Sequence, residues 1–536
     1  MKKYFQYLIL GIISIIITFP IYRYGFVYLL DMVMVPNIYL LDFTGSNVST
    51  DIPVIYLVKG FSVIFSTSFV QKIILTVMLF LSGVFMFKLS SKYADRALAF
   101  LAGLIYMLNP WTYERFLSGQ WYVYFGYAFF PLFILFSLRI LRPGRSRGDQ
   151  VKFVALSALY PIISLHWAFI AALVFAVMFV TRMILFGQVN WRKFSKVVFI
   201  GIIVILIVNS FWLFGGFFSK GTYSSIDPTD FTAFNTATDP QFGTFFNVLS
   251  LYGFWGTDYT LPKHEFSLWW VITLIYLVLA GIGAYYRAKE RDLLSVTLLI
   301  LFIPVLLVSV GTGHSLTKPI VEWLGNVPLF KGLRETGKLI GLIAFTYAWF
   351  IPFGLNKVTE WVSGFSFKNT ARYTLYAAMC LLVFLSVNSI FYVVANEVAV
   401  NEYPMEWEQA EKKLTEDPSS GKVLILPWWG YIRTPFSNFN LISNPARRYF
   451  TNDVVVSEKF ESSVPLESKT EMDTKIDDWV VNQRILASDM EYLKEQGITH
   501  IMLIEEEDSP KYEFLQQEQR LIKEINSKAL KLYKIK

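Results

Sequence analysis

The sequence predicts an α-helical membrane protein that crosses the bilayer many times and ends in a soluble α/β domain. Of its 536 residues, 54% are hydrophobic and only 17% are charged, whereas soluble domains carry about 25% charged residues. The mean hydropathy is +0.45, and long apolar stretches recur through most of the chain. A soluble enzyme of this composition would expose too much apolar surface to water.

Cysteine content and charge exclude further classes of protein. The single cysteine, Cys380, excludes a disulfide framework and a cysteine-based zinc site. The formal net charge is +7, but the Lys and Arg residues are spread among the loops between apolar stretches, so we expect no nucleic acid as a partner. These basic residues instead indicate which loops face the cytoplasm.

Eleven apolar stretches are candidates for transmembrane helices, since a helix needs about 20 apolar residues to cross the hydrocarbon core. They lie near residues 4–22, 71–90, 96–109, 119–141, 152–165, 167–187, 195–215, 267–286, 293–310, 337–355 and 373–395. The pair at 152–165 and 167–187 has an alternative, because Pro161 and the short break after it could instead mark one long kinked helix.

Loop charges predict the orientation of the chain in the cytoplasmic membrane. Alternate loops collect Lys and Arg, as cytoplasmic loops do, and these begin with Lys2 and Lys3 at the N-terminus. The opposite loops, at 23–70, 110–118, 216–266 and 311–336, are poorer in basic residues and hold many carboxylates. We therefore expect the N-terminus inside, and an odd number of helices would place everything after about residue 396 outside.

The composition changes near residue 396, which divides the chain into an expected transmembrane domain, 1–395, and an exterior α/β domain, 396–536. The second part is rich in Glu, Lys, Ser and Asp but keeps strand-like runs. These runs lie at 423–426, 499–504 and 530–533, and helical stretches near 405–416 and 487–496 precede two of them. Helix followed by strand, repeated, predicts a small α/β domain. No P-loop or GxGxxG motif opens it.

The long first exterior loop holds a candidate general base. The run from Tyr24 to Pro36 is apolar except for one carboxylate, Asp31, just beyond the first helix. An ionisable group among apolar neighbours at the membrane surface suits proton abstraction. The structural alternative is that Asp31 caps an interfacial helix.

The second exterior loop, residues 109–121, combines aromatic rings with a charged pair. Its candidate substrate-binding residues are Trp111, Glu114, Arg115, Gln120 and Trp121. Aromatic faces stack on sugar rings, and a carboxylate beside an arginine can orient hydroxyls or bind phosphate. The alternative for the tryptophans is the ordinary aromatic belt at a membrane interface.

Two weaker signals lie in the next exterior loops. His166 occupies a very short turn and is either a substrate ligand or a residue of the interface. The loop after it holds Asp227, Asp230, Asp239 and Asp258, oxygen ligands of the kind that Mg²⁺ or Mn²⁺ prefers, although their spacing matches no specific metal motif. A divalent cation is therefore a possible cofactor, with its ligands unknown.

Three cations precede the tenth apolar stretch on the side where positive charge is least expected. Lys331, Arg334 and Lys338 lie within eight residues, and the spacing of Arg334 and Lys338 predicts that they share one face of a helix. Such a group could hold a lipid phosphate or pyrophosphate. The alternative is that the side chains extend to phospholipid headgroups.

The runs Gly25 to Pro36, Asn109 to Trp121 and Leu333 to Lys338 recur in this order in a known class of protein. Together with the long first loop and the exterior C-terminal domain, they resemble the GT-C superfamily of integral-membrane glycosyltransferases. The resemblance covers roughly residues 1–395 and is greatest to the bacterial and archaeal membrane proteins related to arabinofuranosyltransferases. These enzymes use sugars linked to polyprenyl phosphates.

The resemblance implies roles for particular residues. Asp31 matches the catalytic carboxylate of the first loop, with Asp42 as its substitute, and Arg334 and Lys338 match the site for the donor phosphate. This chain departs from many members in having a lone Asp31 rather than paired acidic residues, and it lacks the Trp-Trp-Asp signature of oligosaccharyltransferases.

The sequence thus predicts a glycosyltransferase, hexosyl or pentosyl, that takes a sugar from a lipid-linked donor at the exterior face of the membrane. The acceptor would be a glycan, a lipid or a protein of the cell envelope. Two other functions stay open, a transporter or flippase of lipid-linked glycans and a non-catalytic assembly protein of the envelope. The eleven stretches contain few charges, whereas a transporter would be expected to carry ionisable residues in mid-membrane.

Overall fold

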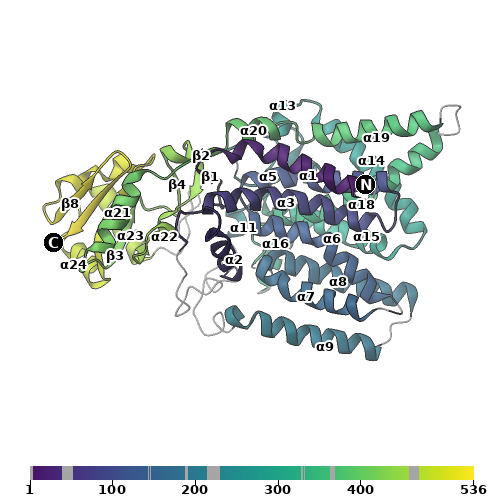
Figure 1. The fold of residues 1–536 in the computed structure, drawn as a ribbon, viewed down its shortest axis with the longest axis horizontal. Helices are drawn as coiled ribbons and strands as arrows, with labels where there is room; N and C mark the ends of the chain where they lie inside the picture. The colour runs from purple at the N-terminus through teal and green to yellow at the C-terminus, as the bar shows by residue number, and fades with distance from the viewer. Residues whose placement is uncertain are drawn as a thin grey trace. The chain divides into compact units, whose positions relative to one another are not determined.

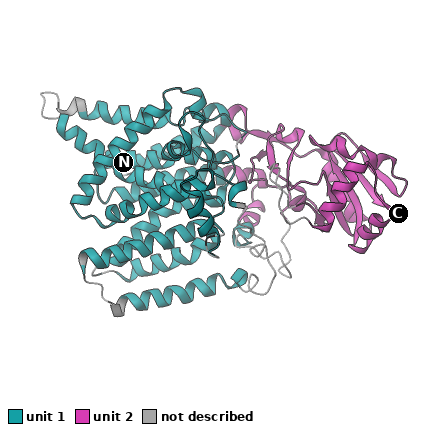
Figure 2. Ribbon diagram, turned by 180° about the vertical axis from the view of Figure 1, so that it is seen from behind, with its two compact units in different colours: residues 1–19, 41–57, 74–394 teal, residues 20–40, 58–73, 395–536 magenta. Residues whose placement is uncertain are grey.

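The computed structural model describes residues 4–38, 52–142, 144, 146–187, 191–213, 230–256, 258–327, 330, 332–362, 368–457 and 470–536. The chain divides into two compact units (Figure 2). Unit 1 comprises Met1–Phe19, Leu41–Leu57 and Ile74–Val394. Unit 2 comprises Pro20–Leu40, Val58–Ile73 and Ala395–Lys536.

Unit 1 is built of helices (Figure 1). Its longer helices are α1 (Phe5–Thr18), α3 (Thr67–Ser90, which starts in unit 2), α4 (Arg96–Met107), α6 (Trp121–Leu141), α7 (Arg147–Ile163), α8 (Leu165–Phe186), α9 (Trp191–Val208), α14 (Trp269–Lys289), α15 (Leu293–Val310), α18 (Ile340–Val362) and α19 (Lys368–Leu385). The shorter elements are α2 (Ile52–Ser62, which ends in unit 2), α5 (Pro110–Leu117), α11 (Asp230–Ala233), α12 (Gly243–Leu249), α13 (Pro262–Glu265), η3 (Gly311–Gly313), α16 (Lys318–Gly325), η4 (Thr336–Leu339) and α20 (Ile390–Asn396).

Within the described residues, eight helices are long and apolar enough to cross a membrane. They are Phe5–Tyr22, Thr67–Ser90, Trp121–Leu141, Leu165–Leu185, Trp269–Lys289, Leu293–Gly313, Thr336–Val362 and Arg372–Asn396. All eleven predicted stretches lie on helices, but those near 96–109, 152–165 and 195–215 form the shorter helices α4, α7 and α9. The Asp95 carboxylate caps the start of α4. This helix has 12 residues, which gives it a length of only about 18 Å.

The uncertain pair of stretches forms two separate helices. Ser164 ends α7 and also caps α8, since its extended backbone breaks the helix and its hydroxyl accepts the amide hydrogen of Trp167. The alternative of one kinked helix is therefore wrong, although Pro161 does lie inside α7.

Helix α18 lies at the centre of unit 1, where it packs against α4, α14 and α15. Glycines permit the closest of these contacts, because a Cβ at Gly283 of α14 would lie 2.1 Å from the carbonyl oxygen of Phe350 in α18. The 3₁₀ turn η4 runs directly into α18 and packs on α15, so the backbone before this helix is held against the bundle.

Unit 2 contains the α/β domain that the sequence predicts. Its elements after residue 395 are β2 (Ala399–Asn401), α21 (Met405–Glu416), β3 (Lys422–Leu426), β4 (Tyr431–Arg433), η5 (Pro435–Ser437), β5 (Leu441–Ser443), α22 (Ala446–Tyr449), β6 (Val454–Val455), α23 (Glu471–Asn482), α24 (Ala487–Glu495), β7 (Ile498–Ile504), η6 (Ser509–Gln517), β8 (Leu521–Asn526) and β9 (Leu530–Ile535). Five strands form a mixed sheet in the order β6-β3-β7-β9-β8, parallel from β6 to β7 and antiparallel beyond.

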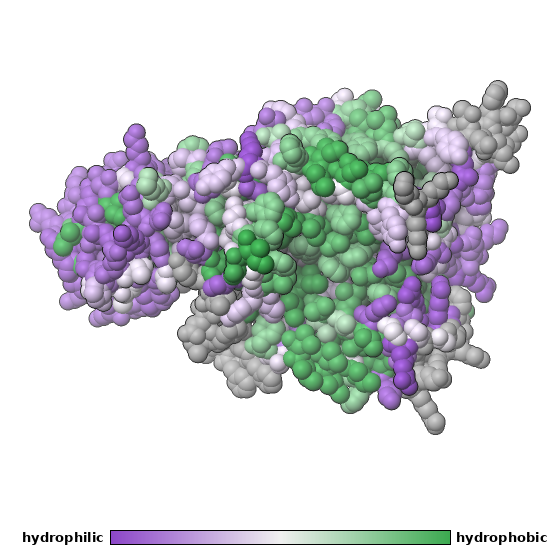
Figure 3. Space-filling view, in the orientation of Figure 1, coloured by the Kyte–Doolittle hydropathy of each residue, from purple (hydrophilic) through white to green (hydrophobic). Residues whose placement is uncertain are grey.

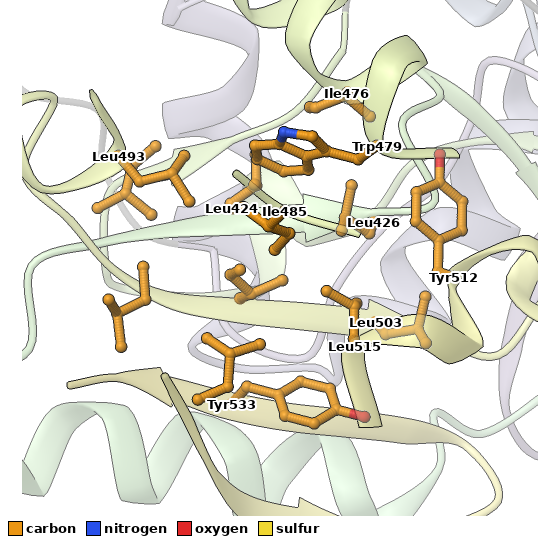
Figure 4. Close-up of a cluster of buried hydrophobic side chains, with 14 of the residues drawn as sticks. Leu424, Leu426, Ile476, Trp479, Ile485, Leu493, Leu503, Tyr512, Leu515 and Tyr533 are labelled. Carbon is orange, nitrogen blue, oxygen red and sulfur yellow. The ribbon is translucent and has the colours of Figure 1, made fainter. Parts of the chain in front are cut away.

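Apolar side chains of the sheet and of the helices that cover it form one core (Figure 4). Leu424, Leu426 and Leu503 of the strands pack with Ile476 and Trp479 of α23. The predicted strands at 423–426, 499–504 and 530–533 and both predicted helices are confirmed. Gly497 follows α24 with a φ of +76°, a conformation that favours glycine at a helix C-terminus.

Part of the first loop also belongs to unit 2. Residues Phe19–Tyr22 form η1, and β1 (Phe26–Tyr28) pairs antiparallel with β2, in the register Phe26 to Asn401. Gly25 makes this approach possible, because its φ is +111° and a Cβ there would lie 2.6 Å from the backbone of Asn401. The start of α3 supports the same segment, since Gln71 exchanges two hydrogen bonds with the backbone of Val27.

Candidate active site

Asp31 lies in unit 2, in the irregular segment that follows β1. Its neighbours Leu29, Leu30, Met32 and Val33 are buried, whereas Asp31 is only half-buried. Both sides of the residue are fixed, because Leu30 O accepts from the Ser443 amide at 2.7 Å and Met32 O accepts from the Gln71 side chain at 3.3 Å. The apolar surroundings predicted from the sequence are thus present. No helix starts at Asp31, so its alternative role as a helix cap is wrong.

The Asp31 carboxylate has a partner from the C-terminal part of the chain. The hydroxyl of Tyr431 donates a hydrogen bond of 2.7 Å to Asp31 Oδ1. Strand β4 carries Tyr431 and pairs with β5, whose Ser443 holds the backbone of Leu30. One β-hairpin therefore positions both the backbone before Asp31 and the carboxylate itself. Asp42, the predicted substitute, lies outside the described residues.

Helix α5 positions the charged pair of the second loop in unit 1. Asn109 caps this helix: its side chain accepts the amide hydrogen of Thr112, and the Thr112 hydroxyl bonds back to the amide of Asn109. Every residue of α5 is buried. Four residues after Trp111, Arg115 comes one turn further along the same side of the helix.

The Glu114 carboxylate binds backbone amides of another loop. Its carboxylate accepts the amide hydrogens of Gly253 at 3.1 Å and Phe254 at 3.0 Å. Burial raises the pKa of Glu114 to about 7, although the Arg115 charge and the two amide bonds favour its ionised form. These contacts fix the loop after α12 against α5.

Arg115 and Lys338 share one buried carboxylate, Glu335. Arg115 Nη1 pairs with Glu335 Oε1, and Lys338 Nζ lies 3.0 Å from Glu335 Oε2. The two cations hold the pKa of Glu335 well below its usual range, at about 2, although burial alone would raise it. The network continues to Gln120, whose amide oxygen is 2.5 Å from Arg115 Nη1.

His166 joins this network through Lys338. Its Nε2 lies 3.1 Å from Lys338 Nζ, and because an ammonium group only donates, the ring nitrogen accepts and the imidazole is neutral. The structure thus brings together five side chains, from the short helix α5, from the segment after it, from the start of α8 and from the turn before α18. They are Arg115, Gln120, His166, Glu335 and Lys338. We call them the buried charge network.

Arg115 keeps unused donors inside this network. The whole residue is buried, yet its Nε and Nη2 have no hydrogen-bond partner in the part of the chain that the structure describes. The guanidinium packs on the rings of Phe254, at 4.8 Å, and Trp111, at 5.6 Å. Buried guanidinium nitrogens almost always find acceptors, so two open donors mark this position as one that suits an anion or a hydroxyl.

Arg334 lies apart from Lys338 along the backbone. It precedes the 3₁₀ turn η4 and is not helical, so the prediction that Arg334 and Lys338 share a helix face is wrong. Glu335 directly precedes the turn with φ −87° and ψ 83°, which is not a helical conformation. The backbone therefore forms a short turn where a helical start was expected. The half-buried Arg334 guanidinium lies over the Phe234 ring at 5.0 Å. Lys331 lies outside the described residues.

Both tryptophans of the second loop are buried. Trp111 Nε1 donates to the carbonyl of Gly337 at 3.1 Å, and its ring packs edge-on against Trp167. Gly341 allows this packing, since a Cβ there would lie 3.0 Å from Trp111. Trp121 packs on its neighbour Tyr122, with ring centroids 4.0 Å apart. In this structure Trp111 therefore ties α5 to η4, and neither ring presents an open face to a sugar.

The described residues contain no group of three His, Cys, Asp or Glu side chains that could hold a metal ion. Asp239, one of the suggested ligands, is instead paired with Lys263 at 2.8 Å. Asp227 lies outside the described residues. The predicted Mg²⁺ or Mn²⁺ therefore has no ligand set in the part of the chain that is described.

Sequence reasoning missed Glu335 and Tyr431. Glu335 follows Arg334 directly, and two cations so near one carboxylate were a signal that these charges pair. Tyr431 carried no comparable signal, because its partner lies 400 positions earlier in the chain.

The fold has relatives among solved structures. The mycobacterial arabinofuranosyltransferase AftD matches 99% of this chain and 40% of its own, with 13% sequence identity and a TM-score of 0.65. The oligosaccharyltransferase of Archaeoglobus fulgidus, in its apo form, matches 94% of this chain and 70% of its own, with 12% identity and a TM-score of 0.51. No protein-family model and no curated protein sequence matches the chain.

These likenesses establish the architecture. The chain has the fold of the GT-C membrane glycosyltransferases, which confirms the fold that its motifs predict. It spans 40% of the length of the mycobacterial arabinofuranosyltransferase.

Proposed function

We propose that the protein is a membrane glycosyltransferase that takes a sugar from a polyprenyl-phosphate or polyprenyl-pyrophosphate donor. The acceptor is a glycan, lipid or protein of the cell envelope, at the exterior face of the membrane. Two kinds of observation support this proposal, the GT-C fold and the Asp31 carboxylate. The proposal depends most on Asp31, a half-buried carboxylate held by Tyr431 within an otherwise buried apolar segment.

In the proposed reaction Asp31 is the general base. Its carboxylate accepts the proton of an acceptor hydroxyl while that oxygen attacks the anomeric carbon of the donor sugar. The bond between the anomeric carbon and the phosphate oxygen breaks, and the phosphate leaves with the bonding electrons. The hydroxyl of Tyr431 bonds to Asp31 Oδ1 and so orients the carboxylate that takes this proton.

A departing phosphate needs neutralisation of its charge more than it needs a proton. We assign this role to Arg334 and Lys338, with Lys331 as a further candidate. Lys338 is already part of the buried charge network, so its ammonium group is fixed by Glu335 and His166. A preorganised cation stabilises developing negative charge without further reorganisation.

Substrate contacts are assigned to the second loop. Arg115 is the strongest candidate, because two of its guanidinium nitrogens have no partner in the described chain. Gln120 and His166 adjoin it through the same network, its guanidinium packs on Trp111, and Glu114 and Trp121 are further candidates. A divalent cation remains part of the proposal, with ligands unassigned, and no step depends on it.

The decisive experiment is a transfer assay with purified protein and a panel of polyprenyl-phosphate sugars. Asp31→Asn keeps the size of the side chain and can still accept the Tyr431 hydrogen bond, but it cannot take a proton. We expect folding and donor binding to survive and turnover to fall by about 10²- to 10⁴-fold.

Asp42→Asn is the matched control, since it removes a second carboxylate from the same loop. Normal turnover in Asp31→Asn together with an inactive Asp42→Asn would move the role of the base to Asp42. Normal turnover in both variants, or no transfer from any donor by the wild-type protein, would contradict the proposed function.

A further inference from the structure

A pocket of about 920 Å³ lies within unit 2. Its wall is formed by the chain that leaves η1, by the turn between α2 and α3, by the first turns of α3 and by Glu402. The lining of the pocket contains neither Asp31 nor Tyr431 nor any residue of the buried charge network.

The wall of this pocket is positively charged. It carries three cations, Arg23, Lys59 and Lys72, against one carboxylate, Glu402. Lys72 Nζ donates to the carbonyl oxygens of Arg23 at 2.6 Å and Gly25 at 2.7 Å, and Arg23 Nη2 donates to Val398 O at 3.3 Å. These carbonyl acceptors orient Lys72 and Arg23, and the charged residues of the lining sum to an excess of two positive charges.

Hydroxyl donors complete a lining suited to phosphate. Ser66 and Ser68 line the pocket and bond to each other, which uses the hydroxyl hydrogen of only one of them. Ser62 and Thr67 also line it, but their hydroxyls donate to the carbonyl oxygens of Val58 and Pro36. Arg and Lys side chains with neighbouring hydroxyl groups are the usual ligands of a phosphate group, because they combine charge with several directed donors. The charge and the donors together indicate an anionic ligand.

The position of the pocket along the chain indicates a membrane lipid. Tyr22 ends the first candidate span and Thr67 begins the second, so the lining residues lie at the ends of two helices that are able to cross a membrane. Chain at the ends of spanning helices lies at the depth of the lipid headgroups, where Tyr, Lys and Arg are enriched.

Apolar residues beside the pocket are exposed. Val63 and Phe69 line it, with Val63 84% exposed, and the adjoining Ile64 is 74% exposed. Neighbouring apolar side chains that are exposed on a folded membrane protein are typical of a surface that the acyl chains of lipids cover. Figure 3 shows that hydrophobic surface extends widely over the helical part of the molecule, whereas the part that holds the β-sheet is mostly hydrophilic.

We propose that this pocket binds the headgroup of an anionic membrane phospholipid, with its phosphate held by Arg23 and Lys59 and its acyl chains against the apolar residues at the turn between α2 and α3. The assignment does not rest on the proposed glycosyl transfer. It gives unit 2 a fixed lipid at the point where the first loop meets the membrane-spanning helices.

The test uses the full-length protein in nanodiscs of phosphatidylcholine alone or with added phosphatidylglycerol. Thermal unfolding and native mass spectrometry report stabilisation and retained lipid. We expect phosphatidylglycerol to raise the melting temperature of the wild-type protein and to be retained. In the double variant Arg23→Gln/Lys59→Gln, the increase in melting temperature caused by phosphatidylglycerol should be at most half of that in wild type. The variant should still fold, because both exchanged side chains are at least partly exposed.

The matched control is Lys412→Gln/Lys528→Gln, which removes two exposed cations of unit 2 outside the pocket. It should keep the full effect of phosphatidylglycerol. An equal loss in both double variants, or none in either, would contradict the proposal. A third arm replaces phosphatidylglycerol with undecaprenyl phosphate; if only this lipid stabilises the protein through Arg23 and Lys59, the pocket holds a lipid carrier and the phospholipid assignment is wrong.

Discussion

The hydroxyl of Tyr431 donates a 2.7 Å hydrogen bond to the carboxylate of Asp31, although the two residues are 400 positions apart. The residue proposed as the base thus comes from the first loop, and the group that orients it comes from the C-terminal part of the chain. Both belong to unit 2. The C-terminal part of the chain therefore contributes a side chain that orients the candidate base.

Tyr431→Phe should slow turnover without unfolding the protein. The hydrogen bond orients the Asp31 carboxylate, and because misplacing a reacting group by about 1 Å can cost about 100-fold, we expect the rate to fall roughly 10- to 100-fold. The acid limb of the pH–rate profile should move to higher pH, because the phenol stabilises the ionised form. Tyr533→Phe is the control, since the Tyr533 hydroxyl is buried without a hydrogen-bond partner in the described chain. A slower Tyr431→Phe enzyme with an unshifted profile would indicate a purely structural role.

Glu335→Gln should destabilise unit 1 strongly. The change leaves Arg115 and Lys338 buried without the carboxylate they share, and breaking a buried ion pair on one side costs about 3–5 kcal/mol. Chemical or thermal unfolding in detergent measures this loss. Glu322→Gln serves as the comparison, because its pair with Lys318 is exposed and an exposed pair contributes at most about 1 kcal/mol. Similar stability losses in the two variants would show that the network contributes no special stability.

Arg334→Gln should weaken donor binding and leave the fold intact, since the side chain is half-buried and packs on one ring. A charge-assisted contact with phosphate contributes about 1.5–3 kcal/mol, which corresponds to roughly a 10- to 100-fold higher Kd for a polyprenyl phosphate. Lys338→Gln should weaken binding and also lower stability, because Lys338 belongs to the buried charge network. Unchanged affinity in both variants would show that neither cation holds the donor phosphate.

Glu114 should make stability depend on pH in a defined window. Its pKa is raised from the ordinary 4.5 to about 7 in the folded chain, so the folded protein binds its proton more tightly than the unfolded chain. Stability from this group is therefore highest below pH 4.5 and falls as the pH rises towards 7. Glu114→Gln cannot ionise, so its melting temperature relative to wild type should increase between pH 5 and pH 8. If the difference in melting temperature between the variant and wild type stays constant with pH, ionisation of Glu114 is not the cause of the pH dependence.

The orientation of the chain is a separate prediction. The loop charges predict residues 397–536 outside and the N-terminus inside. A reporter that is active only in the cytoplasm should stay silent when fused after Lys536 and be active at the N-terminus. Activity at both ends would require an even number of crossings, a parity that the eight long apolar helices alone would give.

The helices and strands were predictable because local patterns determine them. An apolar stretch of spanning length and a strand-like run after Gly497 both carry their signal within a few residues. Helix α4 starts where the stretch near 96–109 predicts but is shorter than a spanning helix, because Asp95 caps its start and Leu108 ends it before Asn109 caps α5.

The site was predictable only in part. The residue types at Asp31, Arg115 and Lys338 identified them as chemically unusual in their surroundings. The pairing of Arg115 with Glu335 joins two loops, and the spacing of Arg334 and Lys338 suggested a helix where a 3₁₀ turn forms. Contacts between distant segments and turn geometry are set by tertiary packing, which no local pattern records.

The pairing of β1 with β2 also sets the order in which the protein can mature. The strand that follows the first helix has no partner until the ribosome has made the strand that follows the last one. At roughly 5–20 residues per second, the 400 positions between Asp31 and Tyr431 take about 20 to 80 s to synthesise. During that time the segment around Asp31 lacks its contacts with β2 and with the β4–β5 hairpin, while Gln71 of α3 can already hold its backbone. A nascent chain that stops before residue 395 would therefore never gain the contacts that position the Asp31 carboxylate.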